Sequence, residues 1–399
     1  MTELTAIGTQ GLGAYVARPP SGHGPLLLVL QEIFGINRHV RALCDLFAEE
    51  GYVAVAPDLF WRQGRGIDID PLGDGAMARA LALLDGFDDA QAMDDIRATL
   101  AFAQVQLGCI GPAAAVGHCL GGRLALRALH DTPVQCAVSY YGVGLETLVT
   151  QPLPVGKSAL LHVAQDDAYS PPPVQAAIRA HAGGAIKACF YPGCDHAFAR
   201  EGGAHFDASA ARLAYDRTLT FLVPRVGPAY DLEALWEKHV DYEFTTRNVD
   251  LTMGTMVAQP YVNHIPTMTG GVGYRDLRRF YADYFIGANP DDAMQVSVSR
   301  TEGARQLVDE LVFSFTHDRR IEWLLPGVEP TGRHVRFGLV GVVRFRGDKL
   351  CHEHIYWDQA TVLAQVGLID PSRLPVLGAE AADKIIDNSL PSNRLIRSW

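Results

Sequence analysis

Short apolar runs alternate with helical patterns over roughly the first 223 residues. The runs with the length of buried strands are 27–30, 53–57, a run closed by Val116, 136–140 and 160–164. Apolar residues at helical spacing occupy 40–50, 90–105, 123–129 and 174–182. Strands that are apolar on both faces indicate a parallel sheet covered by helices on each side. The pattern therefore predicts an α/β domain with a mostly parallel sheet.

The pattern changes after a Pro- and Gly-containing stretch at 224–228. Two helical segments, 232–241 and 274–285, come first. Long strand-like segments follow, at 307–316, 335–345 and 350–358. Helices followed by a meander of strands are typical of an α+β domain. We therefore expect two domains, 1–225 and 226–399, the second including a C-terminal extension.

Composition excludes several classes of partner. The formal net charge of the 399 residues is -11, and no Lys/Arg run offers a surface for nucleic acid. The longest strongly apolar run, 26–30, is far shorter than the roughly 20 residues that cross a bilayer, and the first residues lack a signal-peptide pattern. Seven cysteines without a CxxC pair suggest reduced thiols. We expect a cytoplasmic protein that binds neither nucleic acid nor membrane.

One cysteine has the setting of a nucleophile. Residues 117–121 read Gly-His-Cys-Leu-Gly, directly after an apolar strand and before a helix. The glycines permit the sharp strand-to-helix turn that exposes a nucleophile at the helix N-terminus. A helix N-terminus and a nearby imidazole both favour the thiolate form. Most cysteines are buried and structural, but two flanking glycines fit a turn better than packing, so Cys119 is the predicted nucleophile.

An acid and a base follow the nucleophile in the chain order of α/β-hydrolases. The strand 160–164 ends before Asp166 and Asp167, and His196 stands in the loop after the next strand. Chemistry in open α/β sheets gathers at the carboxyl ends of the strands. The alternative role for either aspartate is to cap the turn before the Ser-Pro pair at 170–171. His196 is thus the predicted base, and the two aspartates compete for the role of acid.

The first domain resembles the dienelactone hydrolase (carboxymethylenebutenolidase) family over roughly residues 5–223. Several separate segments in the family's order carry the resemblance: 31–35, 51–59, 117–122, 140–146 and 196–200. The resemblance implies an α/β-hydrolase fold and hydrolysis of a small lactone or carboxylic ester, without a cofactor or metal. It also implies a thioester between the substrate acyl group and the enzyme.

The resemblance assigns roles to individual residues. Cys119 would attack the carbonyl, His196 would shuttle the proton, and Asp167 would orient the imidazole, because the family spacing to the following proline matches Asp167 with Pro171. The family also implies further site residues: Glu32 to hold and activate the resting thiol, the backbone N–H groups of Ile33 and Leu120 as the oxyanion hole, and Arg200, Tyr141 and a second arginine for the substrate.

The second arginine is less well defined than Arg200. Arg200, four residues after His196, matches a family arginine that binds the substrate carboxylate, a task suited to a planar guanidinium. Arg79 is the nearest candidate for its partner, but the local spacing departs from the family, so Arg62, Arg65 or none are alternatives. This departure leaves the substrate open between an acidic dienelactone and another small lactone or ester.

The second domain resembles the NTF2-like, SnoaL-type fold, a cone formed by a curved sheet and helices. Segments 262–266, 332–333 and 347–359 carry the resemblance. Strand alternation puts His352, His354, Tyr356 and Asp358 on one face. With His264 and Glu310 opposite, this face would line a polar pocket suited to acid/base chemistry. Because His352 and His354 have no third fixed ligand, they are weak evidence for a metal.

The sequence thus predicts a hydrolase with two alternatives. The first alternative is a bifunctional enzyme whose SnoaL-like domain carries an isomerase or cyclase activity. The second is a non-enzymatic protein that binds a small molecule and retains the turn around Cys119. NTF2-like domains also serve as dimerisation modules, so a homodimer through this domain is one predicted assembly.

Overall fold

The computed structural model describes residues 4–8 and 11–399, which form two compact units, 1–229 and 230–399. Each unit has its own sheet and its own hydrophobic core. None of the helices in the described ranges combines the length and the apolar character needed to cross a membrane.

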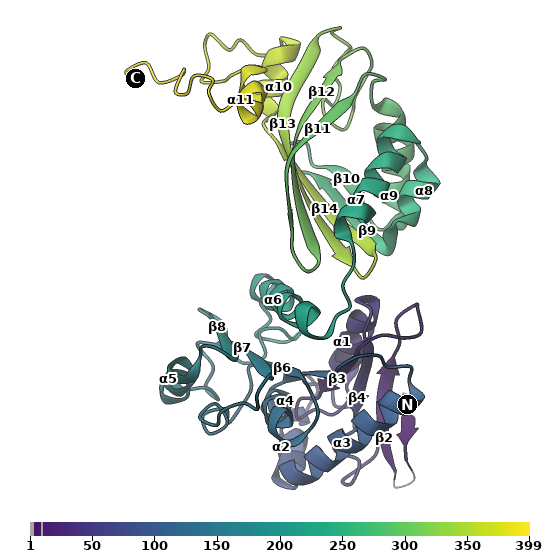
Figure 1. Ribbon diagram of the computed structural model, residues 1–399, viewed down its shortest axis with the longest axis vertical. Helices are drawn as coiled ribbons and strands as arrows, with labels where there is room; N and C mark the ends of the chain where they lie inside the picture. The colour runs from purple at the N-terminus through teal and green to yellow at the C-terminus, as the bar shows by residue number, and fades with distance from the viewer. Residues whose placement is uncertain (1–3, 9–10) are drawn as a thin grey trace. The chain divides into compact units, whose positions relative to one another are not determined.

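The first unit is built on an eight-stranded sheet in the order β1-β2-β4-β3-β5-β6-β7-β8 (Figure 1). The strands from β4 to β8 in this order pair in parallel, whereas β1 and β2 are antiparallel at one edge. The predicted mostly parallel sheet is confirmed. The strands are β1 Thr5–Ile7, β2 Leu12–Ala17, β3 Leu26–Leu30, β4 Val53–Pro57, β5 Ala114–His118, β6 Cys136–Tyr140, β7 Ser158–Ala164 and β8 Ile186–Tyr191.

Helices cover both faces of this sheet. Along β3, Leu28 packs into one hydrophobic core and Val29 into the other, as two-sided burial requires. Helices α1 and α6 contribute to the core that contains Val29, and α2 to α5 contribute to the opposite core. The helices are α1 Arg38–Glu49, α2 Ala76–Asp85, α3 Asp89–Gln106, α4 Leu120–Asp131, α5 Pro172–His181 and α6 Ala208–Val226.

The second unit holds a six-stranded sheet in the order β10-β9-β14-β13-β12-β11. Strands β9 and β14 pair in parallel, and the other neighbours are antiparallel. This sheet-rich, mostly antiparallel unit confirms the predicted α+β class. The strands are β9 Met256–His264, β10 Thr269–Val272, β11 Met294–Glu302, β12 Gln306–Thr316, β13 His334–Arg346 and β14 Lys349–Trp357.

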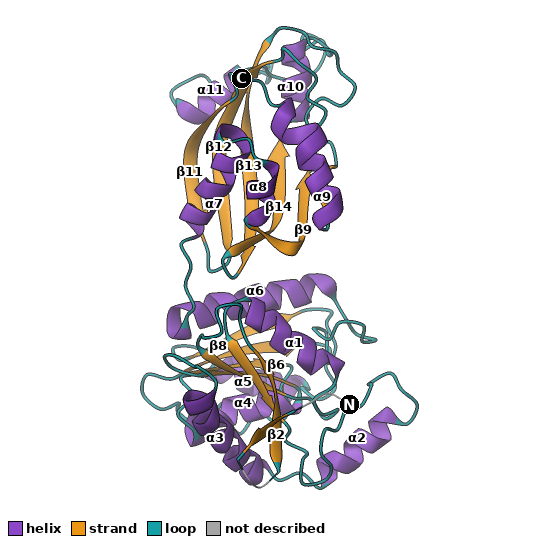
Figure 2. Cartoon of the chain, turned by 90° about the vertical axis from the view of Figure 1, so that its right-hand side faces the viewer, coloured by secondary structure: helices purple, strands orange, loops and turns teal. Residues whose placement is uncertain are grey.

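Helices α7 to α10 of the second unit contribute to the core on the inner face of its sheet (Figure 2), whereas α11 lies against Gly338 on the other face. Both helical segments predicted there begin as α-helices and continue as π-helical turns, Asp241–Thr245 and Tyr281–Phe285. The α-helices are α7 Leu232–Val240, α8 Val249–Gly254, α9 Tyr274–Phe280, α10 Gln359–Val366 and α11 Glu380–Ile386.

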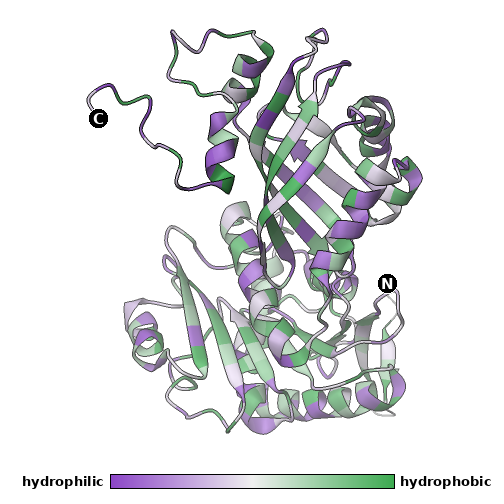
Figure 3. Cartoon of the chain, turned by 45° about the horizontal axis from the view of Figure 1, so that its top comes forward, coloured by the Kyte–Doolittle hydropathy of each residue, from purple (hydrophilic) through white to green (hydrophobic). Residues whose placement is uncertain are grey.

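The two sheets differ in how hydrophobic residues are distributed along their strands. Strands of the first sheet are apolar over most of their length, whereas polar and apolar residues alternate along strands of the second (Figure 3). On β14, Glu353, Ile355 and Trp357 are buried, and Tyr356 between them is exposed. One face of the second sheet therefore faces the interior of the unit. Side chains alternate between the two faces along a strand, so every second residue lies on the interior face.

Candidate active site

Cys119 lies at the junction between β5 and α4, where the chain turns sharply. Strand β5 ends at His118, helix α4 begins at Leu120, and Cys119 adopts φ 55° and ψ -116°. Such a conformation is unusual for a residue with a side chain. The flanking glycines make it possible: a Cβ on Gly117 would stand 1.9 Å from the Gly121 carbonyl oxygen, and one on Gly121 would stand 2.1 Å from the Leu30 oxygen. Backbone crowding therefore requires glycine on both sides of the thiol.

Asp167 and His196 form a direct pair beyond the ends of β7 and β8. The Asp167 Oδ2 atom accepts a hydrogen bond from His196 Nδ1 at 2.7 Å. Its Oδ1 atom accepts from the backbone N–H of Tyr169 at 2.8 Å, so the same carboxylate also shapes the turn. Asp167 is buried, whereas Asp166 is exposed. Of the two aspartates that the sequence left in competition, the structure brings Asp167 to the histidine.

His196 is held between the aspartate and the thiol. Burial alone lowers the pKa of His196, but hydrogen bonds with Asp167 and Cys119 outweigh that effect and raise the pKa to about 10. The rings of Tyr141 and Tyr169 flank the imidazole, with centroids 5.2 Å and 4.8 Å away. This environment favours an imidazolium beside Cys119, which is the partner that a thiolate needs.

A buried ion pair lies beside the thiol. The Arg200 Nη1 atom donates to Glu32 Oε2 at 2.8 Å, and the side chain of Glu32 is almost fully buried. The other carboxylate oxygen of Glu32 accepts no well-aligned hydrogen bond among the described residues. Tyr141 is buried nearby, and its burial together with the Glu32 charge raises the pKa of its phenol well above the usual value. The structure thus gathers Glu32, Arg200, Tyr141 and Cys119 around one point.

Two backbone N–H groups next to Cys119 are available as donors. Leu120 is the first residue of α4, where an N–H has no acceptor within the helix. Ile33 lies in the loop after β3, beside the turn that contains Cys119. Within the described ranges, neither N–H donates to another group of the protein. Both are therefore free to bind an oxygen atom of a substrate.

The predicted second arginine is not brought to Arg200. Arg79 is exposed on α2 and lines a pocket of about 540 Å³ together with Arg65. Arg62 donates to both carboxylate oxygens of Asp95. Arg200 instead lines a different pocket, of about 580 Å³, whose other arginines are Arg38 and Arg41 of α1. Arg41 forms an ion pair with Asp68, and Arg38 is exposed.

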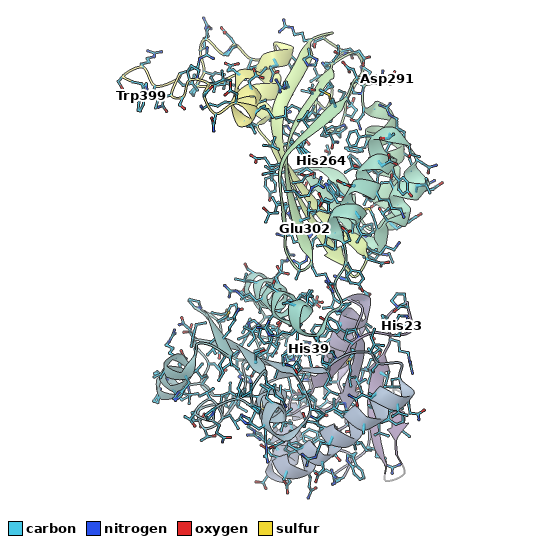
Figure 4. The ribbon with its side chains drawn as sticks, viewed as in Figure 1. His23, His39, His264, Asp291, Glu302 and Trp399 are labelled. Atoms are coloured by element: carbon cyan, nitrogen blue, oxygen red, sulfur yellow. The ribbon has the colours of Figure 1, made fainter. Side chains whose placement is uncertain are left out.

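The sequence analysis did not select Arg38 as a substrate-binding residue, although its position in the chain could have indicated it. It is the first residue of α1 and follows the N-cap residue Asn37. The pocket that it shares with Arg200 is also lined by His39, which Figure 4 labels. Arg38 is therefore better placed than Arg79 to meet a ligand that reaches Arg200.

The second unit contains a small cavity of about 50 Å³ between its sheet and its helices. His264, labelled in Figure 4, lies on its wall. The acidic residues on the wall are Glu243, Asp309 and Glu353, none of which the sequence analysis selected.

The prediction that Glu310, His354, Tyr356 and Asp358 line this cavity is wrong. Neighbouring residues on a strand point to opposite faces, and the inward face of β14 carries Glu353 and Ile355 rather than the residues beside them.

The four residues have other positions and contacts. Glu310 accepts a hydrogen bond from Ser299 at an exposed site, and its neighbour Asp309 points inward. Asp358 caps the N-terminus of α10 through its side chain. His354 is half-buried and Tyr356 is exposed. The prediction thus assigned the wrong face of the strand to the cavity, which is equivalent to a shift of one residue along the strand.

Comparisons with known proteins divide the chain at the same place as the fold. The model of the "Dienelactone hydrolase family" matches residues 12–225, and that of the "SnoaL-like polyketide cyclase" matches residues 241–366. Both resemblances found in the sequence are thereby confirmed.

Curated relatives cover the first unit. A protein of Azospirillum brasilense named "Putative carboxymethylenebutenolidase" is 43% identical over 237 residues, which are 57% of this chain and 100% of the relative. The carboxymethylenebutenolidase of Pseudomonas sp. (strain P51) is 36% identical over 227 residues, 56% of this chain and 95% of the relative. A solved structure, "Putative Dienelactone Hydrolase from Klebsiella pneumoniae", is 32% identical, with a TM-score of 0.46, over 54% of this chain and 95% of that chain.

Proposed function

Because the chain belongs to the dienelactone hydrolase family and is a lactone or ester hydrolase, we propose that it acts through Cys119 as nucleophile, His196 as acid and base, and Asp167 as the residue that orients the imidazole. The observation that carries this proposal is the 2.7 Å bond between Asp167 and His196, with His196 in turn interacting with Cys119 on a glycine-bounded turn.

The first half of the reaction opens the lactone. The Cys119 thiolate attacks the carbonyl carbon, a C–S bond forms, and the carbonyl oxygen takes the negative charge. The free N–H groups of Ile33 and Leu120 are placed to stabilise that oxyanion. The ring C–O bond then breaks while the His196 imidazolium gives its proton to the leaving oxygen. A thioester on Cys119 and a neutral imidazole result.

The second half regenerates the enzyme. Neutral His196 takes a proton from water as the water attacks the thioester carbonyl. The C–S bond breaks, the carboxylic acid leaves, and Cys119 returns to a thiolate beside an imidazolium. Asp167 keeps its hydrogen bond to Nδ1 throughout, so the other ring nitrogen faces the reaction.

Glu32 and Arg200 support this proposal through charge. Glu32 would hold the resting thiol, since its second oxygen is buried and accepts no well-aligned bond among the described residues, and Tyr141 and Arg200 each interact with both Glu32 and Cys119. Arg200 would bind a carboxylate on the substrate. Its Nη1 atom is already bonded to Glu32, so an anionic substrate must use the remaining N–H groups or compete with Glu32. The substrate class we propose is therefore a small lactone or ester, with preference for an anionic one.

The decisive experiment compares two cysteine variants. We expect Cys119→Ala to lose at least about 10³-fold in kcat toward aryl esters and small lactones, with an unchanged melting curve. Cys189→Ala, a half-buried cysteine on β8, should retain the activity.

Mass spectrometry of the reacting enzyme tests the thioester. A lactone opens without losing atoms, so the intact protein should gain the full mass of the substrate during turnover, and Cys119→Ala should gain none. Full activity of Cys119→Ala would contradict the proposal.

A further inference from the structure

A buried cluster in the second unit has the ligands and the geometry of a metal site. The ring nitrogen Nε2 of His239, on α7, lies 3.1 Å from Glu243 Oε1 and 3.3 Å from Glu353 Oε1. One ligand atom from each of these residues can be chosen so that all three lie within 4.8 Å of one another. All three side chains are buried. We propose that His239, Glu243 and Glu353 bind a divalent transition-metal ion.

The tautomer of His239 supports this proposal. The Thr255 hydroxyl donates to the Thr252 carbonyl oxygen at 2.6 Å, because a carbonyl can only accept. The same hydroxyl oxygen must then accept from Nδ1 of His239, at 2.6 Å. Nδ1 therefore carries a proton whether the ring is charged or neutral, and Nε2 is the nitrogen that faces the two glutamates. Metal-binding histidines are typically held in this way by a partner on the other nitrogen.

A single N–H group cannot satisfy the groups that surround Nε2. Glu243 accepts a hydrogen bond from this nitrogen, while Glu353 Oε1 lies equally close but accepts no well-aligned bond among the described residues. The Tyr281 hydroxyl also lies 3.4 Å from Nε2. A metal ion attracts ligands from several directions at once. Ligands about 2.0–2.1 Å from a tetrahedral ion stand about 3.3 Å apart, close to the 3.1 Å and 3.3 Å that separate Nε2 from the two glutamates.

Charge balance points to the same occupant. Metal binding requires Nε2 to be deprotonated, and the neutral imidazole with two carboxylates then carries two negative charges, which a divalent ion neutralises. Neither glutamate forms an ion pair with a lysine or arginine in the described part of the chain. Asp309, which lines the same cavity, differs because Arg300 and Trp236 both donate to it. Asp309 is thus neutralised by an arginine, whereas the cationic partner of the two glutamates in the described ranges is His239.

The backbone around the cluster is also irregular. A π-helical turn begins at Asp241 and carries Glu243, and another begins at Tyr281. Such turns are rare and frequently mark functional sites. Glu243, Glu353 and Tyr281 all face the cavity, whose other walls are mainly apolar and aromatic. A bound ion would therefore present an open position to a small, largely apolar ligand with an oxygen donor, and would act on it as a Lewis acid.

Titration with Co²⁺ tests the site in the full-length chain. The protein carries Cys119→Ala so that the thiol of the first unit does not bind the probe. We expect one equivalent of Co²⁺ to bind with a visible absorption band. Glu353→Gln should weaken the binding at least about 10-fold.

Two control variants separate this cluster from surface binding. Glu310→Gln removes a partly exposed glutamate from the opposite face of the same sheet, and His354→Gln disrupts the histidine pair whose rings are 4.3 Å apart. Both should leave the binding unchanged. Absence of stoichiometric binding, or loss of binding only in His354→Gln, would overturn the proposal.

Melting curves distinguish a metal site from a structural ion pair and show whether the variant folds. In EDTA, Glu353→Gln should be at least as stable as its parent, because one carboxylate remains to pair with His239. With excess Zn²⁺, the melting temperature of the parent should rise by several degrees and that of the variant should not. Equal destabilisation of the variant in both conditions would show that the cluster is a structural ion pair and refute the metal site. Glu243→Gln repeats the test on the second ligand.

Discussion

His196 and His239 both lie next to carboxylates, but the carboxylates stand on different sides of the ring. In the first unit, Asp167 bonds to Nδ1, so the other nitrogen is left to interact with Cys119. In the second unit, Thr255 holds Nδ1, and both Glu243 and Glu353 approach Nε2. A carboxylate bonded to Nδ1 orients the ring as a base. Two carboxylates next to Nε2 instead occupy the nitrogen that would take part in a reaction. We therefore propose different roles for similar residue types: proton transfer in the first unit and ion binding in the second.

The largest expected effect comes from removing the histidine that we propose as the base. His196→Gln should lower kcat for lactone hydrolysis by about 10³-fold or more, because neither thiolate formation nor protonation of the leaving group remains assisted. His264→Gln, on the cavity wall of the second unit, should change it less than about twofold. Steady-state kinetics on one lactone provides the measurement. A larger loss in His264→Gln would move the chemistry to the second unit.

The second-largest effect is expected from the Asp167 carboxylate, which bonds to Nδ1 of His196. Asp167→Asn should reduce kcat by about 10² to 10⁴-fold, since the amide can hold the wrong tautomer and does not stabilise an imidazolium. Asp166→Asn, one residue earlier and exposed, should remain within about twofold of wild type. Both variants can be compared by kcat/KM at one pH. Equal losses would show that Asp167 does not have the proposed role.

A smaller effect should appear at Arg200. Arg200→Lys keeps the positive charge but loses the planar arrangement that binds a carboxylate through two N–H groups. We expect KM to rise about 10-fold for a lactone that carries a carboxylate and to change little for a neutral aryl ester. The ratio of the two KM values is the measured quantity. An equal change for both substrates would indicate that Arg200 serves only to hold Glu32.

The smallest effect is the pH dependence of stability. The pKa of His196 is raised from 6.5 to about 10 in the folded state. Its contribution to stability is therefore complete below about pH 6.5 and is lost as the pH rises towards 10. The difference in free energy of unfolding between wild type and His196→Gln should shrink over that interval. Urea unfolding at several pH values measures it, and a constant difference would contradict the raised pKa.

Much of the fold was predictable because the hydrophobic pattern of individual segments agrees with their positions in the folded structure. The predicted strands 53–57 and 136–140 coincide with β4 and β6, since strands buried on both faces are continuous apolar runs. Strands β1, β2, β9, β10 and β11 were not predicted. Three of them, β1, β10 and β11, lie at an edge of their sheet, and β11 is mostly exposed, so burial leaves little pattern in the sequence there.

By itself, the sequence determined the division into two folds, the turn around Cys119 and the chain order of the three residues that we propose as nucleophile, acid and base. Glycine spacing and strand-end position are local properties, so they can be read without coordinates. Only the tertiary structure showed that Asp167 rather than Asp166 contacts His196, that Arg79 and Arg200 line different pockets, and that the cavity is lined by the face of β14 opposite to the predicted one. Each of these depends on which distant segment packs opposite a residue, and strand parity changes completely with a shift of one position.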